Sequence, residues 1–324
     1  MEPSDSLPLF ARRYFTRREA LEQGETDQSL NAALRAGVLV RLRHGVYARA
    51  SDVVGLDDRE RHLLLARAAF SQQRGAVALA GPSAALLRGY DVFGHDLDTV
   101  HLARLDGGSA RRETGIVHHR IGPAVAARVR PHGELLTVSP EDAVWQVALL
   151  SSLEGGVVTT DAALHRDPTL VEPLAAVVGR SRSHPGSRTA RLALRLARKE
   201  AESPGESLTR VACYRHSIPA PCLQHDVFDR SGRLLGRSDF YWEGARLLGE
   251  FDGRVKYERL LRRGETAADA VVREKHREDE MRGTSCGMSR FVWSEVLPHS
   301  AGRRMAQLRY ELDQSRRLYV RVAA

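Results

Sequence analysis

Lysine is almost absent from this chain of 324 residues. Its 49 basic residues include only Lys199, Lys256 and Lys275, so nearly every positive charge is an arginine. A lysine therefore marks a position where a compact point charge is wanted, because the delocalised guanidinium fork does not replace it. Lys256 is the most informative of the three, since it follows a group of acids.

Cysteine pairs, long apolar runs and nucleotide-binding motifs are also missing. Cys213, Cys222 and Cys286 form no CxxC pair, which argues against a zinc ribbon and a disulfide framework. No run approaches the roughly 20 apolar residues that span a bilayer, and no apolar N-terminal segment precedes a cleavage-like site. There is no Walker loop, Gly-x-Gly-x-x-Gly or His-Glu-x-x-His. We therefore expect a reduced, cytoplasmic protein with no membrane partner.

Positive charge is in excess and unevenly spread. The chain has 49 basic and 41 acidic residues, a net charge of +8. Residues 10–50, 180–200 and 301–324 are the most basic segments. Basic segments around an acidic site suit a polyanion whose backbone must be held, although an arginine-rich composition alone can also make a protein basic.

Residues 237–256 place three acids and a lysine along one expected β-hairpin. Asp239 lies in a strand of alternating character, a turn follows at residues 243–245, and the return strand carries Glu250 and Asp252. Folding this hairpin brings Asp239 opposite Glu250 or one diagonal away, with Cβ atoms roughly 4.5 to 8 Å apart. Two carboxylates at that spacing can share one hard cation, which is the layout of a metal-dependent nuclease site.

These residues resemble the PD-(D/E)XK nuclease superfamily, in the branch related to very-short-patch-repair endonucleases. The matching motifs are Ser203-Pro-Gly-Glu-Ser207, Ser238-Asp-Phe240, Gly249-Glu-Phe-Asp-Gly253, Glu274-Lys-His-Arg277 and Ser289-Arg-Phe-Val-Trp293. Asp252 occupies the position of the superfamily's lysine, and Lys256 stands where the branch commonly has a histidine. The resemblance implies a restriction-endonuclease-like α/β/α domain that hydrolyses phosphodiesters with Mg²⁺ or Mn²⁺.

The same resemblance implies roles for individual residues. The implied metal ligands are Asp239, Glu250, the main-chain carbonyl of Phe251 and, through water or a second ion, Glu206. Lys256 would align the attacking water or steady developing charge. The expected catalytic set is Glu206, Asp239, Glu250, Asp252 and Lys256, and Arg277 is a candidate phosphate contact.

Each of these residues also has a structural interpretation. Glu206 completes a capping box with Ser203, which favours a helix start without any catalysis. Asp239 and Glu250 could form a solvated strand face, Asp252 can begin a turn, and Arg277 can belong to ordinary ion pairs on a helix surface.

The N-terminal residues predict a winged helix-turn-helix. Thr16 and Glu19 form a capping box, and a second helix with Leu30 on its apolar stripe ends at Gly37. Residues 38–47 alternate like a hairpin that turns at His44-Gly45. In this geometry the second helix enters the major groove and the wing reaches phosphates or the minor groove. The expected DNA contacts are Gln28, Asn31, Arg35, Arg41, Arg43 and His44.

This segment resembles the winged-helix domain of AbiEi-type antitoxins from abortive-infection systems. Its start, Thr16-Arg-Arg-Glu19, and its end, Arg41-Leu-Arg-His-Gly-Val-Tyr47, match the hallmarks of that domain. The resemblance implies DNA binding, and a winged helix used only for protein contacts is the alternative.

The remaining chain is mixed in character and carries no recognisable site. Helices are expected at residues 57–73, 81–89 and 139–153, and strands at 99–105, 115–121 and 134–138. His118 and His119 point to opposite faces of a strand, which argues against one shared metal and favours surface polarity. Four segments are expected: a winged helix at 1–50, a mixed α/β domain at 51–179, a basic linker helix at 180–202 and the nuclease-like domain at 203–324.

Together these features predict a multidomain α+β protein that binds DNA and acts as a metal-dependent endonuclease in phage defence or DNA repair. A transcriptional regulator or antitoxin-like protein with a degenerate nuclease fold is the leading alternative. A structural subunit of a defence complex is a third possibility, and a homo-oligomer or a defence-system partner fits any of them.

Overall fold

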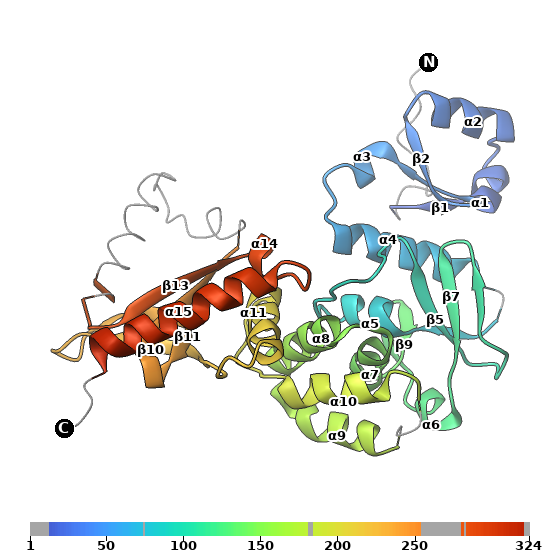
Figure 1. Cartoon of the computed structure of the whole chain (residues 1–324). Helices are drawn as coiled ribbons and strands as arrows, with labels where there is room; N and C mark the ends of the chain where they lie inside the picture. The colour runs from blue at the N-terminus through green and yellow to red at the C-terminus, as the bar shows by residue number, and fades with distance from the viewer. Residues whose placement is uncertain (1–12, 74, 181–183, 254–279, 282, 321–324) are drawn as a thin grey trace. The chain divides into compact units, whose positions relative to one another are not determined.

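The computed structural model describes residues 13–73, 75–180, 184–253, 280–281 and 283–320 (Figure 1). The chain forms two compact units. One contains Met1–Gly155 and Thr169–Ala190, and the other contains Gly156–Pro168 and Arg191–Ala324. Residues 156–168 were expected in the middle domain, yet they belong with the C-terminal unit.

The N-terminal region is winged-helix-like, as expected. Its elements are β1 (Phe15–Thr16), α1 (Arg17–Glu22), α2 (Asp27–Arg35), β2 (Leu39–Arg43) and β3 (Val46–Arg49). The Thr16 and Glu19 capping box is present, with the Thr16 N–H donating to Glu19 Oε2 at 2.7 Å. The strands form a sheet in the order β1-β3-β2. Gly45 turns the wing with a φ of 70°, which a side chain would disfavour.

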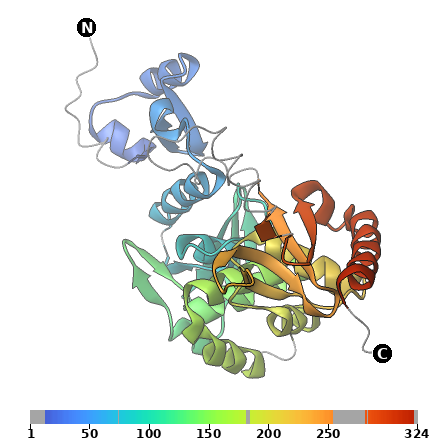
Figure 2. The same ribbon diagram turned by 90° about the vertical axis from the view of Figure 1, so that its left-hand side faces the viewer.

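The wing rests on the end of the next long helix, α4 (Asp58–Ser71). Gln72 Nε2 donates to the carbonyl of His44 at 3.0 Å, and Leu42 packs against the core of the middle domain. Figure 2 shows the blue winged-helix elements beside α4. The two predicted domains of this unit therefore share one packed boundary.

A six-stranded mixed sheet is the centre of the middle domain. Its order is β6-β7-β5-β4-β9-β8, with β4–β9 and β5–β7 parallel. The strands are β4 (Val77–Leu79), β5 (Val100–Arg104), β6 (Arg111–Glu113), β7 (Ile116–Arg120), β8 (Arg130–His132) and β9 (Leu135–Thr137). The helices are α3 (Ala50–Val53), α5 (Gly81–Leu87), α6 (Pro123–Ala126), α7 (Pro140–Leu150) and α9 (Val171–Arg180), with the 3₁₀ turn η2 at Pro168–Leu170. The six elements expected from sequence are all present, with ends shifted by a few residues.

The sequence analysis missed helix α8 (Leu153–Arg166) because Gly155 and Gly156 resemble a chain break. The helix continues through them for a packing reason. A Cβ atom on Gly155 would lie 2.6 Å from the carbonyl oxygen of Phe93, so only glycine permits this close approach.

Histidines are buried in the middle sheet, so the expected surface polarity of His118 and His119 is wrong. His118 is 1% exposed, and its Nε2 lies 2.9 Å from Glu113 Oε1. His119 Nε2 lies 2.9 Å from His101 Nδ1, and the two rings stack at 5.1 Å. They do point to opposite faces, as alternation requires, but both faces are covered.

The C-terminal unit has one sheet in the order β10-β11-β12-β13. Its strands are β10 (Cys222–Phe228), β11 (Leu234–Trp242), β12 (Leu247–Asp252) and β13 (Gly287–Val292), with the 3₁₀ turn η3 at Glu243–Ala245. The first three strands are antiparallel neighbours, and β12 and β13 are parallel. The helices are α10 (Ser187–Leu196), which begins in the other unit, α11 (Pro204–Arg215), α14 (Trp293–Val296) and α15 (Ala301–Tyr319). Figure 1 shows α15, in red, running along the sheet.

Aromatic rings fill the layer between this sheet and its helices. Phe240 and Phe291 are fully buried and meet edge to face at 5.6 Å, and the Trp242 ring completes the group. The Arg304 guanidinium of α15 lies 4.4 Å from the Phe291 ring centre. This packing fixes α15 over the two central strands.

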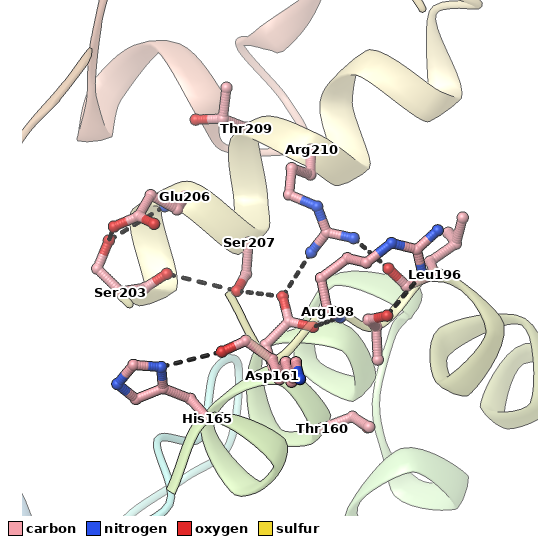
Figure 3. A network of polar contacts seen from close by, with 12 residues as sticks. Thr160, Asp161, His165, Leu196, Arg198, Ser203, Glu206, Ser207, Thr209 and Arg210 are labelled. Carbon is pink, nitrogen blue, oxygen red and sulfur yellow. Dashed lines mark hydrogen bonds and ion pairs between the residues drawn. The ribbon is translucent and has the colours of Figure 1, made fainter. Parts of the chain in front are cut away.

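A buried carboxylate explains why residues 156–168 join this unit (Figure 3). Asp161 of α8 is 1% exposed. Its carboxylate accepts from Ser207 Oγ, Arg210 Nη1 and the Arg198 N–H, each at 2.7 Å. Burial raises the pKa of Asp161, and these donors oppose the rise by favouring the charged form. One acid thus links α8, α11 and the chain after α10.

No helix among the described residues is both long enough and apolar enough to cross a membrane.

The buried histidines predict that acid destabilises the middle domain. Burial lowers the pKa of His101 from 6.5 to about 3 and lowers that of His119 as well. The folded state therefore resists protonation, so this stability is complete above pH 6.5 and is lost progressively as pH falls from there towards 3. The loss reaches up to about 1.4 kcal/mol per pH unit for each such histidine.

Urea unfolding between pH 7.5 and 4.5 measures this slope. His101→Gln should flatten it, and His132→Gln, which changes an exposed histidine of the same sheet, serves as the matched control. Equal slopes in the parent and His101→Gln would contradict the prediction.

The Asp161 network predicts a large loss of stability from one buried substitution. Asp161→Asn removes the charge partner of Arg210, whose side chain is only 11% exposed. We expect the free energy of unfolding to fall by about 3 to 5 kcal/mol. Asp313→Asn breaks an exposed ion pair with Arg316 and should cost far less.

A double substitution, Asp161→Leu with Arg210→Met, should recover part of that loss, because it leaves no unpaired buried charge. Denaturant unfolding followed by circular dichroism measures all four proteins. If Asp161→Asn is no less stable than Asp313→Asn, the network does not stabilise this unit.

Candidate functional site

Helix α2 presents a polar face to solvent. Gln28, Asn31 and Arg35 are all exposed and are spaced three and four residues apart, which places them on one side of the helix. Leu30 on the opposite side is buried with Phe15 and Tyr47. The helix is thus anchored by its apolar side, while the side with the predicted base contacts is accessible.

Ion pairs and caps fix the angle between α1 and α2. Arg17 Nε donates to Asp27 Oδ1 at 2.7 Å, and Arg17 Nη2 contacts the second oxygen of the same carboxylate. This pairing lowers the pKa of Asp27 and raises that of Arg17. Thr26 caps α2 by accepting from the Ser29 N–H at 3.1 Å.

The predicted contacts of the wing do not share one environment. Arg41 is exposed, and its guanidinium lies 5.8 Å from the Tyr47 ring centre. His44 is exposed at the turn. Arg43 is half-buried, and its Nη1 is enclosed without a hydrogen-bond partner among the described residues. Arg43 therefore faces the middle domain, and Arg41 and His44 are the predicted wing residues that face solvent.

The predicted acids of the C-terminal unit lie where β11 and β12 separate. The paired register ends at Phe240 and Gly249, so Asp239 and Glu250 are the next residues outward. The Ser238 hydroxyl donates to the Gly249 carbonyl at 2.8 Å and accepts from the Gly249 N–H at 3.2 Å. Side chains therefore replace the backbone ladder at this point.

Asp239 continues this replacement. Its Oδ2 accepts from the Phe251 N–H at 2.8 Å, so the carboxylate is turned towards the backbone of β12. In an antiparallel pair the N–H and C=O of one residue face the same neighbouring strand. The Phe251 carbonyl is accordingly on the Asp239 side, as its predicted role as a ligand requires.

Glu206 is buried at the start of α11, where the sequence places a capping box. It is 2% exposed and accepts from Ser203 Oγ at 2.6 Å and from the Glu202 N–H at 3.0 Å. Gln224 Nε2 also donates to Glu206, at 2.9 Å. These three donors account well for a structural role of the carboxylate.

The sequence analysis did not single out Gln224, which connects the two groups of acids. It lies between the register pairs Leu223–Phe240 and His225–Ser238, opposite Asp239. Its φ of 50° is left-handed, and a glutamine rarely adopts that conformation without a specific reason. Its side chain reaches Glu206 from the strand next to Asp239, and only the three-dimensional structure reveals this.

A close contact joins α11 to the same point. A Cβ atom on Gly205 would lie 2.1 Å from the Phe251 ring, so this glycine lets the helix rest directly on the ring. The ring also meets Trp293 edge to face at 5.3 Å. Phe251 therefore contacts α11 with its side chain and Asp239 with its backbone.

The other predicted residues are only partly described. Glu250 and Asp252 are half-buried on β12, in register with Arg290 and Val292 of β13. Lys256 and Arg277 lie outside the described residues. Within the described ranges, no group of three or more His, Cys, Asp or Glu side chains is arranged to hold a metal ion. Mg²⁺, however, commonly takes only one or two carboxylates and completes its shell with water and phosphate, which Asp239 and Glu250 could satisfy.

Comparison with known proteins gives matches at both scales. A family described as "Transcriptional regulator, AbiEi antitoxin" matches residues 5–50. Two Mycobacterium tuberculosis proteins, titled "Uncharacterized protein MT2308" (strain CDC 1551 / Oshkosh) and "Uncharacterized protein Rv2248" (strain H37Rv), are each 31% identical over 271 residues. Each alignment covers 78% of this chain and 93% of the relative.

Among solved structures, the Rv2827c protein of Mycobacterium tuberculosis has a TM-score of 0.38 and 16% identity. That match covers 67% of this chain and 83% of the other. The alignments to the two relatives extend far beyond the winged helix. The chain belongs to the family of MT2308 and Rv2248, and it carries an AbiEi antitoxin-type transcriptional regulator domain at its N-terminus.

Proposed function

We propose that this protein is a DNA-binding transcriptional regulator of the AbiEi antitoxin type. The observation that carries the proposal is the exposed face of α2, where Gln28, Asn31 and Arg35 line up at helical spacing on a helix anchored by its other side. Such a face fits the major groove, and the match of residues 5–50 to the regulator family supports the same function.

The roles of the residues follow from their side-chain chemistry. Gln28 and Asn31 carry amides, which can pair with the edge of an adenine and so select sequence. Arg35 and Arg41 neutralise phosphates and set the register without selecting bases. The positive charge of residues 10–50 attracts DNA of any sequence.

Substitutions on α2 and on the wing should separate these roles. Asn31→Ala should change the preference among duplex sequences by about tenfold or more at one position. Arg41→Ala should weaken binding to all sequences and reduce the salt slope by roughly one unit. Arg303→Ala in α15 removes an exposed arginine of the other unit and is the control for net charge.

Fluorescence anisotropy with a selected duplex and a scrambled duplex, at several salt concentrations, measures both effects. The proposal fails if the parent protein shows no affinity for any duplex at low salt. It also fails if Asn31→Ala and Arg303→Ala behave alike on every sequence.

We propose a second candidate function for the C-terminal unit, hydrolysis of phosphodiester bonds with Mg²⁺ or Mn²⁺. The specific observation in its favour is the separation of β11 and β12, where Asp239 and Glu250 are the next residues on neighbouring strands. The resemblance to PD-(D/E)XK nucleases and the α/β/α fold that it implies belong to this proposal. The comparisons favour DNA binding over catalysis.

In this second function the residues of the chain position the reacting groups. A bound Mg²⁺ would supply Lewis-acid stabilisation of the phosphate. Asp239 and Glu250 would bind it, and the hydrogen bond from Phe251 would hold Asp239 in place. Lys256 is expected to orient the attacking water and Asp252 to assist it, while Glu206 would act only indirectly.

The Phe251 hydrogen bond suggests a sharper variant than alanine. Asp239→Asn keeps an acceptor for the Phe251 N–H and removes the charge, so it should abolish cleavage of plasmid DNA without lowering the melting temperature. Glu250→Gln should do the same, and Glu243→Gln changes an exposed acid of the same hairpin as the control. Lys256→Ala should reduce turnover by about 10²-fold, with DNA affinity almost unchanged, and Lys256→Arg should rescue it poorly.

Cleavage that survives in both Asp239→Asn and Glu250→Gln would exclude this site. A parent protein that binds DNA but does not cut it with either metal would leave the regulator as the function of the whole chain.

A further inference from the structure

A polar cavity lies between the wing and the middle sheet, away from the exposed face of α2. Its volume is about 540 Å³, within the range of small-molecule sites. Arg43 and His44 of the wing line one side, and Arg104, Arg111 and His118 of the sheet line another. Neither of the functions proposed above uses this cavity.

Two polar atoms in its lining are buried without a hydrogen-bond partner among the described residues. They are Nη1 of Arg43 and Nδ1 of His118. A buried polar group without a partner costs about 1 to 3 kcal/mol, so native proteins rarely leave one unsatisfied. Two such atoms lining one cavity therefore indicate that something polar binds there.

The charges in the lining show what kind of group is missing. Asp106 is paired with Arg104 through two hydrogen bonds of 2.9 and 2.6 Å. Glu113 is paired with Nε2 of His118. The acids of the lining are thus matched by neighbours, and the guanidinium groups of Arg43 and Arg111 supply the remaining positive charge.

The two unpartnered atoms have complementary needs. Arg43 Nη1 can only donate, so it requires an acceptor. When Nε2 of a neutral His118 donates to Glu113, its Nδ1 is an acceptor and requires a donor. A group with anionic oxygens and a hydroxyl meets both requirements, and a phosphate monoester or inorganic phosphate has this chemistry. A carboxylate alone supplies the acceptor but no donor.

We propose that this cavity, named here the wing cavity, binds a small phosphate-bearing ligand between Arg43 of the wing and His118 of the sheet. The volume leaves room for more than inorganic phosphate, such as a sugar phosphate. Because Arg43 belongs to the wing and His44 is tied to Gln72 at its rim, the ligand fixes the wing against the middle domain. This last consequence rests on the proposed DNA binding, whereas ligand binding itself does not.

Isothermal titration calorimetry of the full chain, at constant ionic strength, tests the proposal with inorganic phosphate and ribose 5-phosphate as separate probes. We expect saturable binding of at least one probe with a stoichiometry of one. Tighter binding of ribose 5-phosphate identifies a monoester as the ligand, and equal or tighter binding of inorganic phosphate identifies the free ion.

Matched substitutions on one strand locate the site. Arg43→Gln should weaken the bound probe by at least about tenfold, because it removes a charge-assisted hydrogen bond. Arg41→Gln removes the same charge two residues away, outside the cavity, and should change the affinity less than about twofold. His118→Asn tests the second atom, and circular dichroism checks that this buried variant is folded.

The absence of saturable binding for both probes would overturn the proposal. Equal weakening by Arg41→Gln and Arg43→Gln would also overturn it, because that result indicates general attraction to a basic surface. A DNA titration run in parallel separates the two hypotheses. Phosphate binding without DNA binding would refute the regulator and keep the cavity, and DNA binding without phosphate binding would do the reverse.

Discussion

The buried carboxylate of Asp161 is the constraint on which the C-terminal unit depends. A charge taken out of water is tolerated only when donors surround it, and Ser207, Arg210 and the backbone of Arg198 are those donors. Ser207 and Arg210 belong to α11, so the acid sets where that helix begins. The position of Glu206, next to Ser207, follows from this anchor.

The two units use polar side chains in different ways. In the C-terminal unit, Ser238 and Asp239 take over the hydrogen bonds of a strand pair and so separate β11 from β12. In the N-terminal unit, polar side chains on α2 are left exposed while the wing turns Arg43 inward. The first arrangement places acids where strands diverge, and the second presents a surface suited to DNA.

Local patterns could be predicted from sequence, and contacts between distant segments could not. The capping box at Thr16 and the neighbouring strands of Asp239 and Glu250 follow from spacing alone, and both are present. The inward turn of Arg43 depends on which surface the wing packs against, which alternation does not encode. The left-handed backbone of Gln224 had no signal either, because that residue type seldom adopts it. The two glycines within α8 gave a misleading one.

Phe251 has a consequence for how movement passes through the C-terminal unit. Its ring lies against Gly205, where no side chain intervenes, and its N–H holds Asp239. The ring is therefore a spacer of fixed thickness between helix α11 and the strand that carries the acid. A rigid aromatic plane cannot be compressed, so any tilt of the helix must displace the peptide of Phe251 and the carboxylate bound to it. Helix and acid are coupled as one mechanical part.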